Sequence, residues 1–184
     1  MADIHTNIKR DLIQSRLLSA IFSRSIKNQV VLKGGMAMRV LFGSQRYTKD
    51  IDLGQNQDQS LRSLQSMMRL AIKDSVQGFL ENVSVTEPKQ IDTVARWKIG
   101  GNVIGGGTEI HITVEVSRRG VPEGHVVQKN FIPPKESYAQ TTVIDVYDHD
   151  AMIFSKVIAL HSENRVAPRD LYDLHIMISS EVRP

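Results

Sequence analysis

A short apolar run that stops at two glycines constrains the fold of this chain more than any other feature. Residues 30–33 (VVLK) have the composition of a buried strand, and Gly34 and Gly35 end it. Residues 36–42 (MAMRVLF) predict a helix that begins directly after the glycine pair. Bare backbone amides at a helix N-terminus form a natural cradle for phosphate groups, so this element indicates a phosphate-binding site.

Two aspartates flank one isoleucine at a second predicted strand, 51–53 (IDL). Because side chains alternate between the faces of a strand, Asp50 and Asp52 project to one face, while Ile51 and Leu53 point into the core. Two nearby carboxylates raise each other's pKa unless a cation compensates them, and an all-oxygen site suits magnesium. Taken alone, a D-x-D pattern is more typical of a capped surface turn than of a metal site.

A third carboxylate is available on the predicted strand 108–117 (TEIHITVEVS). Its apolar residues alternate with polar ones, so Glu109, His111, Thr113 and Glu115 share one face. If this strand lies beside 51–53, Glu115 joins the two aspartates as a third ligand, and Glu109 on the same face is the alternative. A metal site next to a phosphate-binding site is the arrangement that phosphoryl or nucleotidyl transfer requires.

The rest of the chain predicts an α+β fold, with helices bracketing a mixed β-sheet. Helical spacing predicts helices over 8–27, from 61 to about 80, over 150–162 and from Pro168 onward, around a β-rich region that contains VSVT, VARWKIG, TEIHITVEVS and VVQKNFI. Gly105-Gly106-Gly107 favours a hairpin turn, because no helix follows it. We expect a single domain over 1–184, in which residues 148–184 form C-terminal helices that complete the site.

Composition limits the classes of function. The chain has 184 residues, 41% of them apolar and 23% charged, which is ordinary for a globular protein. It has no cysteine, which excludes disulfides, thiol catalysis and cysteine-bound zinc. The net charge of +3 permits an anionic partner. The basic residues of the first helix are compatible with a solvated face or an RNA-facing one. No segment is typical of a signal peptide or a membrane span, so we expect a cytoplasmic protein.

Lys156 interrupts an otherwise apolar helical run, and burying an unpaired ammonium group is costly. A partner anion is therefore expected, either Asp170 or a ligand phosphate. Asp170 and Asp173 are three residues apart and share a helix face, and Arg169 can pair with Asp173 at four-residue spacing.

Two segments together resemble the AbiEii/AbiGii nucleotidyltransferase toxin family of the DNA polymerase beta-like nucleotidyltransferase superfamily. The first is LKGGMAMRVLFGSQRYTKDIDL (32–53), where the family typically reads LKGGTALRLLYG, a basic residue, Ser or Thr, one residue and D-x-D. The second is AMIFSKVIALHSENRVAPRDLYDL (151–174), which is similar to the family's helix lysine followed by R-D-x-x-D-L.

The resemblance implies a minimal nucleotidyltransferase fold and a function. The chain would be the toxin of a toxin–antitoxin or phage-defence system, transferring NMP from an NTP to an RNA (a tRNA 3′ end) or a protein hydroxyl, with a cognate antitoxin as partner. Mg²⁺, or Mn²⁺ in its place, would be bound by Asp50, Asp52 and Glu115. Lys156 and Asp170 would complete the catalytic set. The nucleotide-binding set would be Lys33, Gly34, Gly35, Arg46, Thr48, Lys156, Arg169 and Asp173. The alternatives are a catalytically silent module that binds a nucleotide, RNA or antitoxin, and phosphoryl transfer from the same site.

Overall fold

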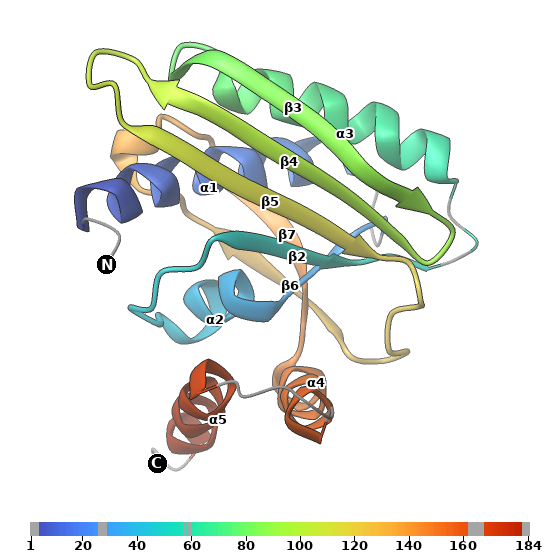
Figure 1. The fold of residues 1–184 in the computed structure, drawn as a ribbon. Helices are drawn as coiled ribbons and strands as arrows, with labels where there is room; N and C mark the ends of the chain where they lie inside the picture. The colour runs from blue at the N-terminus through green and yellow to red at the C-terminus, as the bar shows by residue number, and fades with distance from the viewer. Residues whose placement is uncertain (1–3, 26–28, 57, 59, 162–167, 182–184) are drawn as a thin grey trace.

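The computed structural model describes residues 4–25, 29–56, 58, 60–161 and 168–181, and in this part of the chain one mixed sheet organises the molecule (Figure 1). Its strand order is β3-β4-β5-β2-β1-β7-β6. The strands are β1 (Val31–Lys33), β2 (Asp50–Gly54), β3 (Leu80–Ile91), β4 (Val94–Val103), β5 (Glu109–Ser117), β6 (Val126–Phe131) and β7 (Thr142–Tyr147). The helices are α1 (Ile4–Arg24), α2 (Gly34–Phe42), α3 (Leu61–Val76), η1 (Lys135–Ser137), α4 (His149–His161) and α5 (Pro168–Glu181). The predicted α+β class with a mixed sheet and flanking helices is confirmed.

The two faces of the sheet differ in what covers them. Alternation buries Ile51 and Leu53 of β2 and the isoleucines and valines of β5 on one face, all at most 2% exposed. Helices α1 and α3 lie behind this face in Figure 1, and α4 and α5 lie below α2. The apolar side chains of α1, such as Leu17 and Ile21, are fully buried there. The opposite face of β3, β4 and β5 has no helix over it in Figure 1.

The basic residues of α1 are largely structural. Arg10 donates to the backbone oxygen of His111 at 3.2 Å, and Arg16 donates to the backbone oxygens of Ser75 and Ser137, each at 2.8 Å. Arg24 forms an ion pair with Asp74. These guanidinium groups tie α1 to β5, α3 and η1, so neither a solvated face nor an RNA-facing one is needed to account for Arg10 and Arg16, whereas Arg24 is exposed.

The element boundaries follow local chemistry. Helix α3 ends at Val76, before the position predicted, because Gly78 has a φ of +75° and begins the turn into β3. The three glycines at 105–107 form the hairpin turn between β4 and β5, as expected. The predicted ends of the first helix (26–27) and of the 150–162 helix (162) lie outside the described residues. In the described part, no helix has the length and apolarity needed to cross a membrane.

Candidate active site

A row of four charged residues crosses the sheet at the predicted site. β2 pairs with β5 in parallel and with β1 in antiparallel register, so Asp52 lies opposite both Lys33 and Glu115. β4 continues the row, with Arg96 opposite Glu115. The order across β1, β2, β5 and β4 is therefore Lys33, Asp52, Glu115, Arg96, two acids between two bases. The condition that this strand lies beside β2 is met, and Glu115 rather than Glu109 is the carboxylate beside Asp52.

Asp50 occupies the next row on the same face, opposite Thr113. Burial raises the pKa of Asp52 to about 6, and the negative charges of Asp50 and Glu115 add to this rise. Lys33 and Lys156 act in the opposite direction but do not cancel it. Burial likewise lowers the pKa of Lys33, against the attraction of Asp52 and Glu115. Asp52 is thus a buried carboxylate whose ionised form its neighbours do not fully stabilise, and a bound cation would favour that form.

The carboxylates fit a metal in part. Asp50 and Asp52 offer oxygen ligands from one face of one strand, the donor type that Mg²⁺ prefers. Glu115 is engaged, because its Oε2 accepts a 2.8 Å hydrogen bond from Arg96 Nε and a second from Nη2. In the described residues, no three His, Asp or Glu side chains converge as a set that could hold a metal ion. The expected set of Asp50, Asp52 and Glu115 stays a prediction, and both hydrogen bonds from Arg96 go to Oε2 of Glu115, so binding of an ion through Oε1 does not require Arg96 to move.

The glycine pair provides close backbone approach to the carboxylates. Gly34 has a φ of +69°, and a Cβ atom on it would lie 2.4 Å from Oδ2 of Asp52. A Cβ on Gly35 would lie 3.1 Å from Nη2 of Arg46 and 3.2 Å from Oγ1 of Thr48. Helix α2 begins at Gly34, and no side chain caps its N-terminus. This arrangement leaves backbone amides next to the carboxylates, as a phosphate cradle requires.

The Gly34→Ala variant is expected to lose nucleotidyl transfer, because the added methyl group displaces the Asp52 carboxylate. The matched control is Gly43→Ala at the other end of α2, where φ is +60° and no atom lies within 4 Å of the added Cβ. Both variants introduce similar backbone strain, about 1 kcal/mol on unfolding in denaturant. Only Gly34→Ala should abolish transfer. Equal activities of the two variants would contradict the close approach of Gly34 to Asp52.

A buried ionic cluster connects the end of the chain to the site. Lys156 of α4 donates to Asp170 and Asp173 of α5, each at 2.7 Å. Asp173 is fully buried and also accepts two hydrogen bonds from Arg46, at 3.0 and 2.7 Å. The expectation that Asp170 is an anionic partner of Lys156 is confirmed. One carboxylate, that of Asp173, joins α5 to α4 and to the loop before β2.

Two predicted ligand residues have different surroundings from those expected. Arg169 is exposed in the first turn of α5, and Asp173 binds Arg46 and Lys156 in its place. Arg169 and Asp173 are four residues apart, but their side chains point in different directions, because Asp173 is buried in the interior and Arg169 is exposed. Thr48 makes a turn contact, since its hydroxyl accepts from the Asp50 amide at 3.3 Å, and it also lies beside Gly35, so its role at the nucleotide stays a prediction.

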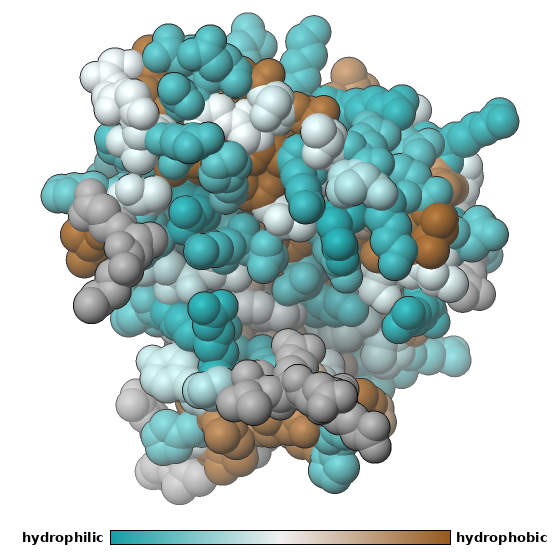
Figure 2. Space-filling model, viewed as in Figure 1, coloured by the Kyte–Doolittle hydropathy of each residue, from teal (hydrophilic) through white to brown (hydrophobic). Residues whose placement is uncertain are grey.

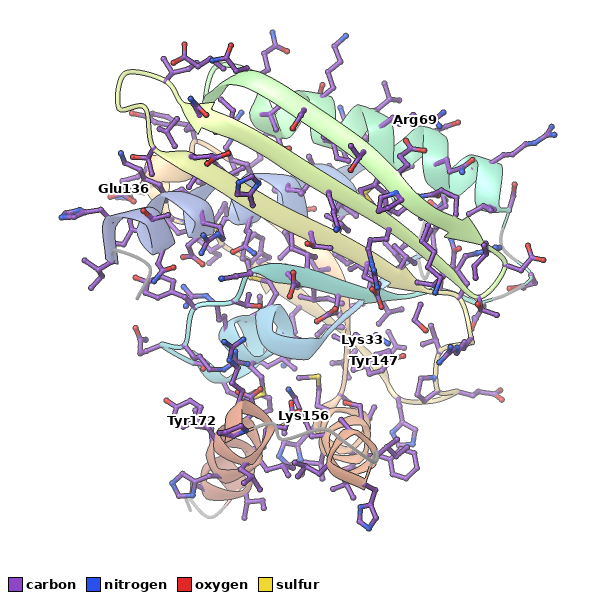
Figure 3. The ribbon with its side chains drawn as sticks, in the orientation of Figure 1. Lys33, Arg69, Glu136, Tyr147, Lys156 and Tyr172 are labelled. Carbon is purple, nitrogen blue, oxygen red and sulfur yellow. The ribbon has the colours of Figure 1, made fainter. Side chains whose placement is uncertain are left out.

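These groups surround a cavity of about 220 Å³. Its lining consists of Lys33, Gly34, Asp52, Leu53, Glu115, Ser117, Ser155, Lys156, Ala159 and Asp170. Figure 3 shows Lys33 and Tyr147 between the sheet and the α4–α5 pair, with Lys156 on the helical side. Residues from the two ends of the chain thus meet in one site.

Sequence analysis missed Arg96 and Tyr147. Tyr147 is 5% exposed, its ring centroid lies 5.9 Å from Nζ of Lys33, and its hydroxyl lies over Gly54, where a Cβ would approach within 2.9 Å. The aromatic ring therefore lies next to Lys33 and Gly54, behind the residues that line the cavity. The signal for both residues is strand register, which brings Arg96 opposite Glu115 and Val146 opposite Leu32.

Comparisons with known proteins agree with this geometry. The crystal structure of JHP933 from Helicobacter pylori is 19% identical and has a TM-score of 0.68, over 97% of this chain and 68% of that chain. A crystal structure of a "putative nucleotidyltransferase" from H. pylori is also 19% identical, with a TM-score of 0.69, over 96% of this chain and 69% of that one. At this identity the likeness shows the fold. No curated protein matches the sequence.

The family assignment rests on a match that covers most of the chain. Residues 16–184 match the family described as nucleotidyl transferase AbiEii toxin, type IV TA system. The match includes the glycine pair, the carboxylate row and the C-terminal ionic cluster. The chain therefore belongs to the AbiEii family of nucleotidyltransferase toxins of type IV toxin–antitoxin systems.

Proposed function

We propose that this toxin is a magnesium-dependent enzyme that transfers NMP from an NTP to a hydroxyl group of its acceptor, an RNA such as a tRNA 3′ end or a protein. The observation that supports this proposal most directly is the position of Asp52, opposite Glu115 and in near contact with Gly34. Acidic ligands and phosphate-binding amides then act on the same phosphate group. The role would be growth inhibition in a toxin–antitoxin or phage-defence system, and the family implies a cognate antitoxin partner.

Each part of the site has a role in this reaction. The amides at Gly34 and Gly35, together with Lys33, bind the phosphates of the NTP. Asp50 and Asp52 would hold Mg²⁺ (or Mn²⁺), which supplies positive charge to the α-phosphate and to the leaving group when bound. Glu115, whose Oε1 is the oxygen that Arg96 does not bond, accepts the proton of the attacking hydroxyl. The new bond joins the acceptor oxygen to the α-phosphorus, the bond from that phosphorus to the bridging oxygen breaks, and pyrophosphate leaves.

Parallel labels test the reaction type. The protein is incubated with total cellular RNA or protein and with NTPs labelled at the α- or γ-phosphate. We expect label in the acceptor from the α position only, with release of pyrophosphate. Transfer of the γ label would indicate phosphoryl transfer. NTP binding in calorimetry without transfer of either label would indicate a catalytically silent binding module, and either result overturns the proposal.

Binding of Mg²⁺ is expected to weaken as the pH falls through about 6. Because the pKa of Asp52 is raised to about 6, the metal-free site holds a proton below that value, and the cation must displace it. Calorimetry at about pH 5 and about pH 8, in buffers of different ionisation enthalpy, measures the affinity and the protons released. The Asp52→Asn variant is the control and should release none. Equal affinity at both pH values would contradict the role of Asp52.

A further inference from the structure

An open polar surface continues the rows of the carboxylates outward. The row of Asp52 and Glu115 leads to Arg96 on β4 and then to Lys89 on β3. The row of Asp50 leads through Thr113 to Lys98 on β4 and Thr86 on β3. Since neighbouring strands are about 4.8 Å apart, these basic residues lie within roughly 10–15 Å of the aspartates. We call Lys89, Arg96 and Lys98 the basic platform.

The lysines of the basic platform are available to a partner. Lys89 and Lys98 are exposed, and within the described residues no side chain forms an ion pair with them. Other basic residues of the chain differ in this respect, since Arg24, Arg39 and Arg69 each pair with a carboxylate. Hydrophilic side chains predominate over β3, β4 and β5 in Figure 2. Besides Glu115, the paired strands carry two acidic residues on this face, Glu81 and Glu109. Both lie at the end of the face away from Asp52.

The surface has few groups that read nucleic-acid bases by stacking. The one Phe, Tyr or Trp side chain of strands β3, β4 and β5 is Trp97, which is fully buried on the opposite face. The imidazole of His111 lies on the open face, where it contacts Glu109 towards the end away from Asp52. The open face instead offers ammonium groups, hydroxyl groups (Ser84, Thr86, Thr113) and the amide of Asn102. Such groups bind phosphates and sugars, which position a nucleic acid without reading its sequence.

We propose that the basic platform binds the phosphodiester backbone of an RNA acceptor, next to its reacting end and independently of base identity. This inference rests on the proposed function, because it places the acceptor hydroxyl at Asp50 and Asp52. The nucleotides that precede the hydroxyl then cross β5, β4 and β3, where their phosphates meet Lys98, Arg96 and Lys89.

The test measures binding without turnover, so its outcome is separate from that of the transfer assay. Fluorescence anisotropy follows labelled uridine and adenosine homopolymers of about 20 nucleotides, longer than one binding site, over a range of salt concentrations. The variant is Lys89→Gln with Lys98→Gln. The matched control is Lys73→Gln with Lys129→Gln, which removes two exposed lysines on α3 and β6.

The double variant is expected to weaken RNA binding roughly tenfold and to reduce the slope of log affinity against log salt by about 1.4, for two lost phosphate contacts. The control should match the wild type, and the two homopolymers should bind within about twofold of each other. Calorimetry with Mg²⁺ and NTP should be unchanged in the double variant, which shows that the site is intact. An equal loss of RNA binding in the control variant, or a strong preference for one homopolymer, would overturn the proposal. Binding of polyglutamate as tight as that of RNA would overturn it too, because it would indicate an acidic protein partner or no specific partner.

Discussion

The Asp52→Asn variant is expected to lose nucleotidyl transfer and to gain stability at the same time. Transfer should fall at least about 100-fold, because a metal ligand is replaced. Stability should rise because burial raises the pKa of Asp52 to about 6, so the ionised carboxylate destabilises the metal-free fold at about pH 8. Thermal unfolding without metal should therefore show a melting temperature a few degrees above that of the wild type.

The gain in stability of Asp52→Asn is expected to depend on pH. A group whose pKa is raised in the folded state contributes stability below its unfolded value, near 3.8, and this contribution is lost as the pH rises through about 6. The advantage of Asp52→Asn should thus be present at about pH 8 and absent near about pH 4. Asp92→Asn, a change of an exposed loop aspartate, is the control and should alter neither property. Full transfer activity, or a lower melting temperature at pH 8 than the wild type, would refute the assignment.

The second large effect is expected at Asp173, in the opposite direction for stability. Asp173→Ala leaves Lys156, which is 11% exposed at its side chain, and Arg46 without a shared carboxylate. Removing one partner from a buried ionic group costs about 3–5 kcal/mol, so denaturant unfolding should show a loss of this size. Asp173→Asn keeps the shape but not the charge and should lose less. The control is Asp150→Asn, whose side chain is 77% exposed.

Variants of Asp173 also distinguish a structural role of this residue from a role in nucleotide binding. The resemblance to the family implies a nucleotide-binding residue, whereas the contacts describe a residue that holds α5 against α4 and the loop before β2. We expect the fall in transfer by Asp173→Asn to be accompanied by the loss in stability. A variant that is as stable as the wild type but inactive would show that Asp173 acts on the nucleotide instead.

Local patterns predicted one half of the site. The strand, glycine pair and helix, and the common face of Asp50 and Asp52, depend on residues adjacent in sequence, where periodicity and glycine chemistry are decisive. The α+β class followed from the same kind of signal. The pairing of β2 with β5 could only be assumed as a condition for the third carboxylate. The reason is that β5 is more than fifty residues further along the chain, and a single sequence does not reveal strand pairing.

Long-range partners account for what was missed. Arg46 and Asp173 are 127 positions apart, and their ion pair replaced the local pairing of Arg169 with Asp173 that helical spacing suggested. The interaction of Arg96 with Glu115 depends on the register of β4 and β5, which the apolar alternation of either strand does not determine. The single-domain organisation and the metal and nucleotide ligands stay predictions.

The two halves of this site differ in their tolerance to sequence drift. The separation of Asp52 and Glu115 is determined by the hydrogen-bonded ladder between β2 and β5, and backbone bonds of this kind survive most side-chain replacements. The position of α5 depends on the side chains of Arg46, Lys156 and Asp173, each of which a single substitution removes. Mutational scanning should therefore find that β2 and β5 tolerate replacement of exposed side chains next to the carboxylates, while their buried apolar positions, such as Ile51 and Val114, stay sensitive. On the helical side, loss of any one of the three charged side chains is enough to release α5.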